Sequence, residues 1–237
     1  MSLTLTRRYN VDRFGYLIPT KYGNVPMVGA VATYRPGEGR FGRGAVAVEE
    51  GTTNLWTNPG WLDGTLSGWG NTSLDVATGI REVVRDVRFG YALRLAKTDS
   101  GDGRWGVFQN KTWHQTGSVI ADSVYVKVIS ASSGVRLSLY SDYHNSGGSS
   151  YWGRGWNLNL NTFELYPQHQ GTASITPVGD GWYRIEFVTA EGDIVGGPSY
   201  YWIDGAPAEV LLAYPQKEAK PFATSFVDGT RAKGTLH

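Results

Sequence analysis

The sequence predicts an all-β fold, in which short strands and tight turns build a two-sheet β-sandwich behind an extended N-terminal arm. Glycine accounts for 32 of the 237 residues, nearly twice its usual share of about 7%. Aromatic residues make up 13% of the chain and charged residues only 18%. A helical bundle would be rich in Ala, Glu, Lys and Leu, and a disordered chain would lack the aromatic residues. Turn-forming and strand-forming residues therefore dominate the composition.

Charge, cysteine content and hydropathy exclude several classes of function. The formal net charge is +1, so no overall field draws the protein to nucleic acid or to an anionic membrane. The chain contains no cysteine, which excludes disulfides, a thiol nucleophile and a zinc–thiolate site. The N-terminal residues lack the apolar core of a signal peptide, and no apolar run is long enough to span a membrane. We expect a soluble protein with neither a nucleic-acid nor a membrane partner.

Residues 1–44 are expected to form a docking arm. Proline and glycine punctuate this segment, and its seven cations face only two anions, Asp12 and Glu38. Its apolar residues, Tyr16 and Ile18 among them, are too numerous for a free linker. The arm is expected to dock on its own body or on a neighbouring subunit. An ordinary pair of edge strands is the alternative.

The body is expected over residues 45–226, followed by a short tail at residues 227–237. Apolar residues alternate with polar or small ones in four segments, at residues 91–95, 124–128, 135–139 and 183–187. This period of two predicts strands with one buried face. Residues 79–87 are dominated by β-branched residues and arginines and favour a strand over a helix. No internal repeat is present, which argues against a propeller or a β-helix.

The motifs of known enzymes are absent, so no enzyme and no cofactor are predicted. Residues 37–42 (GEGRFG) match a dinucleotide-binding pattern, but the helix that this pattern requires does not follow. Residues 99–103 (DSGDG) resemble a calcium loop without its distal glutamate, and a plain turn is the expected structure. A glycosidase is the least favoured alternative; its candidate carboxylates are Glu164, Glu186, Asp204 and Glu209.

The middle of the chain holds aromatic residues that lie among Gly, Ser, Asn, Asp and His rather than among apolar neighbours. Flat rings beside amide, hydroxyl and carboxylate groups suit a pyranose, whose C–H face packs on the ring and whose hydroxyls bind the polar groups. The candidate carbohydrate-binding residues are Trp105, Trp113, Tyr140, Tyr143, Tyr151 and Trp152. The alternative is that half of these rings fill the core and the rest form a subunit interface.

Four segments in order resemble domains of bacteriophage tail and minor structural proteins. Residues 40–55 (RFGRGAVAVEEGTTNL) resemble a junction in which an apolar strand ends in Glu-Glu and a turn leads to Thr-Asn-Leu. Residues 57–69 (TNPGWLDGTLSGW) resemble the opening of carbohydrate-binding jelly rolls, with Trp61 in place of the usual phenylalanine. Residues 180–185 (DGWYRI) and 213–226 (AYPQKEAKPFATSF) are similar to the late strand and the closing element of those domains.

The resemblance implies a jelly-roll β-sandwich, of the concanavalin or carbohydrate-binding-module type, on a phage virion. It implies a non-enzymatic structural protein of the tail or capsid surface that assembles through its arm, with a homotrimer favoured. The implied partners are other virion proteins, further copies of the chain and a host-surface polysaccharide. Some related jelly rolls hold a structural calcium ion, and Asp63 is the metal-binding position carried over. A capsid decoration protein without a sugar role and a stand-alone carbohydrate-binding module are the alternatives.

Overall fold

The protein is all-β in the part of the chain that the structure describes. The computed structural model describes residues 16–20, 23–27, 52–74, 77–101, 103–109, 114–115, 119–144, 151–168, 171–189, 194–224 and 226–231. Two compact units divide the chain: Asn54–Ala223 form one, and Met1–Thr53 together with Thr224–His237 form the other. The arm and tail boundaries expected at residues 44 and 226 remain predictions.

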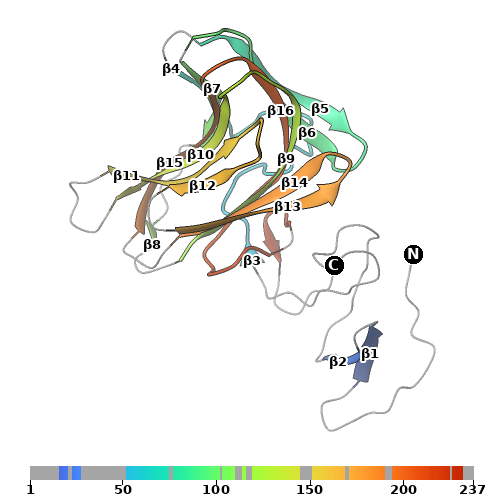
Figure 1. Ribbon diagram of the computed structural model, residues 1–237. Coiled ribbons are helices and arrows are strands. Elements are labelled where there is room, and N and C mark those ends of the chain that lie inside the picture. Colours follow the sequence, from blue (N-terminus) through green and yellow to red (C-terminus); the bar gives the residue numbers. More distant parts are fainter. Residues whose placement is uncertain are drawn as a thin grey trace. The chain divides into compact units, whose positions relative to one another are not determined.

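The larger unit consists of two antiparallel sheets packed face to face (Figure 1). The first sheet has the strand order β12 (Leu165–Gln168), β11 (Tyr151–Asn159), β10 (Arg136–His144), β15 (Ile194–Asp204), β7 (Arg104–Gln109) and β4 (Gly70–Leu74), and β8 (His114–Gln115) also pairs with β15. The second sheet has the order β13 (Gly171–Gly179), β14 (Trp182–Thr189), β9 (Ala121–Ala131), β16 (Ala208–Glu218), β6 (Gly90–Lys97) and β5 (Gly79–Asp86).

The chain crosses repeatedly between the two sheets. It passes from β6 to β7, from β9 to β10, from β14 to β15 and from β15 to β16, changing sheet each time. Strands that are neighbours in space are therefore often distant in sequence. The prediction of a jelly-roll β-sandwich is confirmed. The strands expected from alternation are present as β6, β9, β10 and β14, and residues 79–87 form β5 as expected.

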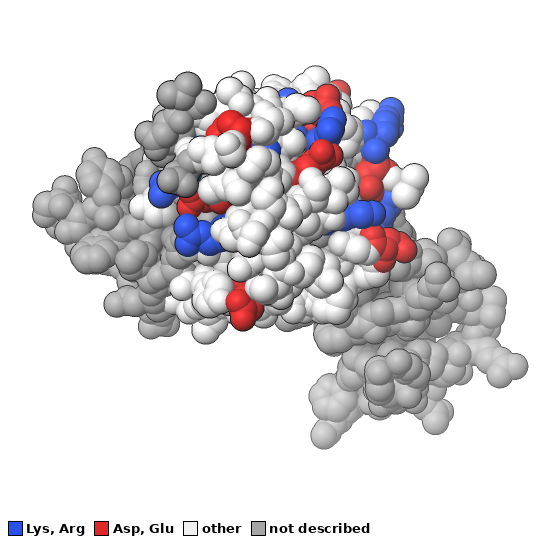
Figure 2. Space-filling view, turned by 45° about the horizontal axis from the view of Figure 1, so that its top comes forward, with Lys and Arg blue, Asp and Glu red and all other residues white. Residues whose placement is uncertain are grey.

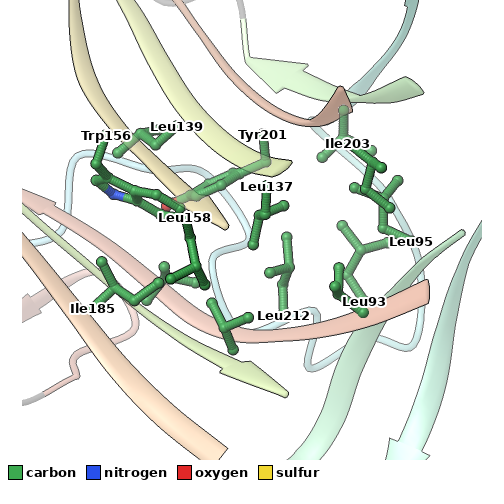
Figure 3. Close-up of a cluster of buried hydrophobic side chains, with 14 of the residues drawn as sticks. Leu93, Leu95, Leu137, Leu139, Trp156, Leu158, Ile185, Tyr201, Ile203 and Leu212 are labelled. Carbon is green, nitrogen blue, oxygen red and sulfur yellow. The ribbon is translucent and has the colours of Figure 1, made fainter. Parts of the chain in front are cut away.

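The inner faces of the two sheets form a continuous apolar core. Leu93 and Leu95 of β6, Leu137 and Leu139 of β10, and Ile185 of β14 are all fully buried. Figure 3 shows these side chains meeting between the layers of strands. Each position alternates with an outward-facing residue, as the period of two requires. Full burial of one such side chain contributes about 1.5–3 kcal/mol.

Much of the aromatic surplus belongs to this core. Trp56, Trp61, Trp69 and Trp156 are all at most 7% exposed. Three of them, Trp56, Trp69 and Trp156, contact the fully buried Tyr201 ring of β15, and Trp61 packs on Trp69. The ring centroids of Trp56 and Trp69 lie 4.9 Å apart, and those of Trp61 and Trp69 lie 5.4 Å apart. These four tryptophans therefore stabilise the sandwich and are not available to a ligand.

The smaller unit contains two short strand pairs. β1 (Tyr16–Thr20) and β2 (Gly23–Met27) form an antiparallel hairpin within the predicted arm. β3 (Thr52–Thr53) pairs with β17 (Thr230–Arg231), so residues from the two ends of the sequence meet. Among the described residues, each of these strands pairs only with its partner.

Charged side chains on the outer surface are mixed in sign. On the face drawn in Figure 2, cationic and anionic groups are interspersed. Elsewhere in the described residues, opposite charges also pair directly: the Arg94 guanidinium of β6 lies 2.8 Å from Glu82 and 2.9 Å from Glu209.

Within the described ranges, no helix is long and apolar enough to cross a membrane.

Gly106 of β7 lies where β7 and β15 approach each other closely, and a substitution there tests this approach. A Cβ atom at this position would lie 2.0 Å from the Tyr201 carbonyl oxygen and 2.7 Å from the Trp202 Cα. We expect Gly106→Ala to lower the free energy of unfolding by about 1–3 kcal/mol or more, because the backbone must move apart. Chemical denaturation measures the loss.

Gly101→Ala is the matched control. Its added Cβ would meet only Asp99 Oδ1 at an ordinary 3.4 Å, so its free energy of unfolding should stay within about 0.5 kcal/mol of the wild type. Equal losses in the two variants would contradict the close approach at Gly106.

Candidate functional site

The strand register of the first sheet arranges its outward side chains in three rows. Residues paired across neighbouring strands share a face of a sheet. In β10, Leu137, Leu139 and Ser141 face the core, so Ser138 and Tyr140 face outward. Each outward residue of β10 therefore belongs to a row that extends through β15 and β7. The rows differ in chemical character.

The first row is aromatic. Tyr140 pairs with Tyr200 of β15, which pairs with Phe108 of β7. Glycines flank the three rings, because Tyr140 pairs with Gly155 on one side and Phe108 pairs with Gly70 on the other. Gly70 gives the Phe108 ring room, since a Cβ there would lie 2.5 Å from the ring. All three aromatic side chains are half-buried.

The second row is mixed. Trp202 of β15 pairs with Ser138 of β10, which pairs with Asn157 of β11, and the Ser138 hydroxyl donates a hydrogen bond to Asn157 Oδ1 at 2.5 Å. At the sheet edge, Asn157 pairs with Tyr166 of β12, which is 51% exposed. In this row the Trp202 indole and the Ser138 hydroxyl are buried, at 7% and 1% exposure, and the Asn157 amide is half-buried.

The rings of the first two rows form an offset stack. Tyr140 and Trp202 have ring centroids 5.3 Å apart at an interplanar angle of 25°. Phe108 and Tyr200 are stacked at 5.7 Å and 29°. Tyr200 also contacts Trp202 at 5.3 Å. In such offset contacts each ring is held in place by its neighbours. The four rings therefore form a rigid aromatic cluster on this side of the sheet. We call these four side chains the aromatic platform.

The third row is charged. Asp204 of β15 lies between two arginines, with Arg136 Nη2 at 3.3 Å from Oδ2 and Arg104 Nε at 3.8 Å from Oδ1. The Arg104 guanidinium also lies over the Trp202 ring, 4.8 Å from its centroid. The side chains of Arg136 and Arg104 are 51% and 43% exposed. Two cations and one anion therefore border the aromatic platform.

The structure separates two of the residues predicted to bind carbohydrate. Tyr140 lies on the aromatic platform. Trp105 pairs with Ile203 and faces inward, where its indole donates a hydrogen bond to the Ile80 carbonyl at 3.2 Å. The Arg81 guanidinium covers the Trp105 ring at 3.3 Å. In this register Trp105 aligns with the buried Ile203 and Leu137, whereas Tyr140 aligns with Tyr200 and Phe108. Trp105 and Tyr140 therefore lie on opposite faces of the first sheet, and carbohydrate binding by either residue stays a prediction.

The other four predicted residues remain predictions. Tyr143 of β10 is the cross-strand partner of Trp152 of β11, and Tyr151 is the partner of His144. The backbone therefore brings Tyr143, Tyr151 and Trp152 to one end of the β10–β11 pair, whereas their side chains are not among those described. Trp113 lies outside the described residues.

Sequence reasoning missed Phe108, Tyr200 and Trp202. A signal was present in residues 199–203 (SYYWI), where Tyr200 and Trp202 alternate with the buried Ser199, Tyr201 and Ile203. This alternation indicates that both faces of the strand carry large side chains. The pairing of Tyr200 with Phe108 depends on strand order, which the local sequence does not contain.

Asp63, the predicted metal position, caps a turn. Its carboxylate accepts hydrogen bonds from the Thr65 backbone N–H at 2.9 Å, the Thr65 hydroxyl at 2.8 Å and the Asn58 amide at 3.2 Å. These bonds, led by the Thr65 N–H, hold the pKa of Asp63 below its usual value. Across the described ranges, no group of three His, Cys, Asp or Glu residues is placed to hold a metal ion. Calcium binding at Asp63 stays a prediction.

The loop of residues 99–103 binds a cation that the protein itself supplies. The Lys97 ammonium donates hydrogen bonds to Asp99 Oδ1 at 2.7 Å, to the Asp99 carbonyl at 2.9 Å and to the Gly101 carbonyl at 2.7 Å. The Lys97 side chain is completely buried. An ammonium thus occupies the position toward which these three oxygens point, and the expected turn at residues 99–103 stays a prediction because residue 102 lies outside the described residues.

The four candidate carboxylates of a glycosidase are each engaged elsewhere. Glu164 accepts a hydrogen bond from the Tyr166 hydroxyl at 2.7 Å, and Glu186 lies 3.2 Å from Arg184. Asp204 and Glu209 pair with the arginines described above. Each of the four therefore has a partner outside this set, and a glycosidase stays the least favoured alternative.

Comparisons with known proteins give structural similarity only. No protein-family model and no curated relative matches the chain. The enzymatically active domain of tailspike protein 4 from bacteriophage CBA120 is similar, with a TM-score of 0.46 and 12% identity, covering 70% of this chain and 21% of that chain. The family 11 carbohydrate-binding module of the cellulase Lic26A-Cel5E of Clostridium thermocellum has a TM-score of 0.45 and 13% identity, covering 73% of this chain and 96% of the module.

A carbohydrate-binding module, CBM28, specific for non-crystalline cellulose, has a TM-score of 0.45 and 12% identity, covering 73% of this chain and 99% of that chain. The chain spans about a fifth of the length of the tailspike domain. Similarity at this level assigns neither a family nor a function, which therefore have to be inferred from the side chains of the site.

The Lys97–Asp99 pair predicts a specific pH dependence. The Lys97 ammonium and the Thr78 N–H lower the pKa of Asp99 from 3.8 to about 2. Because the folded-state pKa is depressed, the ionised carboxylate stabilises the fold above about pH 4, and this contribution is lost as the pH falls toward 2. Asp99→Asn should be less stable than the wild type at pH 7, and the difference should narrow below pH 4. Urea unfolding at a series of pH values measures it.

Asp180→Asn is the control for this pH series. Asp180 is 83% exposed and lies 3.5 Å from Arg88, so its removal should change stability little at any pH. A gap between Asp99→Asn and the wild type that does not vary with pH would contradict the ionic role of Asp99.

Proposed function

We propose that the unit of residues 54–223 is a non-catalytic glycan-binding module whose binding surface is the aromatic platform. The carrying observation is the platform itself: three half-buried outward rings, Phe108, Tyr140 and Tyr200, packed beside the Trp202 ring, which is 7% exposed. Partly exposed aromatic side chains that gather in the middle of a sheet are typical of a binding surface. The half-buried rings also have a fixed position, which limits the entropy lost when a ligand binds.

The chemistry of the platform matches a sugar chain. A pyranose offers C–H groups that pack on aromatic rings, and hydroxyls that exchange hydrogen bonds with amides, hydroxyls and charged groups. The first row supplies aromatic surface, and the second supplies the half-buried Asn157 and the exposed Tyr166 at the sheet edge. Successive rows of a sheet permit contacts with more than one sugar residue along a chain.

The charged row favours glycans with acidic substituents. Arg136 and Arg104 share the single carboxylate of Asp204, which leaves an excess of positive charge at this border. Guanidinium groups bind carboxylate and sulfate in a two-point geometry. Binding of such a glycan is expected to weaken with salt, since the arginines are partly exposed.

The location and the assembly of the module are proposed from the sequence. The ordered motifs of residues 40–230 support a phage structural protein, located on the virion, whose residues 1–44 dock on other virion proteins and hold it in a trimer. Many copies on one particle would bind a host-surface polysaccharide by avidity, even where each site is weak. A stand-alone carbohydrate-binding module agrees with the structure equally well.

Alanine substitutions on the platform test the binding surface. We expect Tyr140→Ala and Tyr200→Ala each to weaken glycan binding about tenfold, because each removes a stacking ring. Affinity electrophoresis against a panel of neutral and acidic polysaccharides identifies a ligand, and titration calorimetry measures the loss.

Two control variants separate binding from folding. Tyr125→Ala removes a half-buried tyrosine from β9 in the second sheet, and Trp105→Phe removes the inward indole. Both should keep the wild-type affinity, although Trp105→Phe should lower stability. Weakened binding in the Tyr125 variant, or full binding in both platform variants, would rule out the platform as the site.

Oligomeric mass tests the assembly role. Size exclusion with light scattering should show a trimer for the full chain, and a monomer for a chain that begins at Ala45, because the arm provides the subunit contacts. A full-length monomer that truncation leaves unchanged would contradict arm-mediated assembly and favour the stand-alone module.

A further inference from the structure

An amine and a carboxyl group face each other inside the sandwich. Asp122 of β9 and Lys217 of β16 are direct cross-strand partners, and both side chains are only 1% exposed. Lys217 Nζ lies 3.6 Å from Asp122 Oδ1. Neither group belongs to the platform. The pair lies in the interior between the two sheets, whereas the platform lies on the outer face of the first sheet. A buried ion pair of this kind is costly unless the remaining polar atoms are also satisfied.

The amine is well oriented. Lys217 Nζ donates hydrogen bonds to the hydroxyl of Ser141 at 2.9 Å and to the hydroxyl of Ser199 at 2.8 Å. Both serines project from the first sheet, so the lysine side chain bridges the two layers. The Trp56 ring lies 4.9 Å from Nζ on a further side. The two serine hydroxyls and the Trp56 ring thus hold the nitrogen 3.6 Å from Asp122 Oδ1.

The Asp122 carboxyl group, by contrast, lacks hydrogen-bond partners. Among the described residues, neither oxygen of Asp122 accepts a hydrogen bond, and the fully buried Tyr201 hydroxyl also has no hydrogen-bond partner. Burial raises the pKa of Asp122, although the neighbouring Lys217 ammonium opposes this shift. Burial lowers the pKa of Lys217, although the Asp122 carboxylate opposes it. For both groups burial is the larger cause, and it favours the uncharged forms, a carboxylic acid beside a neutral amine.

We propose that Lys217 and Asp122 react to form an intramolecular amide bond that joins β16 to β9. Lys217 Nζ, as the neutral amine, attacks the Cγ atom of the protonated Asp122 carboxyl. The new N–C bond replaces the bond between Cγ and the carboxyl hydroxyl, which leaves as water after taking up one proton from the nitrogen. No oxidant, metal or cofactor takes part, and the protein loses one water molecule.

The surroundings favour this condensation over hydrolysis. Groups held in contact inside a protein react with effective concentrations of about 10⁵–10⁸ M, and the dry core keeps bulk water from the product.

The intact mass of the full chain tests the bond. Under denaturing conditions the wild type should weigh less than its sequence by one water molecule. Lys217→Arg cannot form the amide and should show the full mass. Comparing the two proteins with the mass difference calculated for the substitution alone cancels any processing of the N-terminus. A peptic digest of the wild type should yield one branched peptide that contains both residue 122 and residue 217.

Lys97→Arg is the matched control. Lys97 is also a completely buried lysine beside a carboxylate, at 2.7 Å from Asp99. Asp99 is held ionised by its hydrogen bonds and lowered pKa, so this pair should stay ionic and the variant should still lack one water.

The wild type decides the outcome even where Lys217→Arg fails to fold. A wild-type chain with the full sequence mass, and separate linear peptides that contain residues 122 and 217, would overturn the proposal and leave a buried ion pair only. Loss of one water at another pair of residues in the digest would overturn it equally.

Discussion

The pairing of β10 with β15 is the contact on which the other features of this protein depend. In one register, Tyr140 meets Tyr200 on the outer face, and Ser141 meets Ser199 on the inner face. The outer pair begins the aromatic platform, and the inner pair binds the Lys217 amine. A shift of one residue would exchange the two faces of a strand. It would bury the tyrosines and expose the leucines of β10, so the core and both candidate sites require the same alignment.

The strands were predictable because their evidence is local. Alternation over five residues identifies β6, β9, β10 and β14, and turn clusters separate them. Strand order is not local: β7 and β15 are neighbours although Phe108 and Tyr200 are far apart in the sequence. The platform could therefore be anticipated only at Tyr140. Trp105 was grouped with it because both residues have polar neighbours in the sequence, whereas the period of two places them on opposite faces.

Polar sequence surroundings were a poor guide to exposure for a physical reason. In a strand, each residue has neighbours on the opposite face, so a buried ring is flanked in sequence by surface groups. Trp156 illustrates this, since it is 1% exposed between Gly155 and Asn157. The Asp122–Lys217 pair had no sequence signal at all, because charged residues occur throughout the chain and only the β9–β16 register brings these two together.

The side chain of Asn54, near the start of the body, forms hydrogen bonds with the backbone of β16, near its end. β16 pairs with β6 only as far as Leu212, and a bulge follows between Ala213 and Gln216. Beyond it, Asn54 takes the place of a neighbouring strand: its amide donates to the Pro215 carbonyl, and its Oδ1 accepts the Lys217 N–H across a sequence separation of 163 residues. During synthesis, residue 54 therefore leaves the ribosome long before its partner exists. The sandwich stays open along this edge until nearly the whole body has been translated, so a protective chaperone is most useful in that interval.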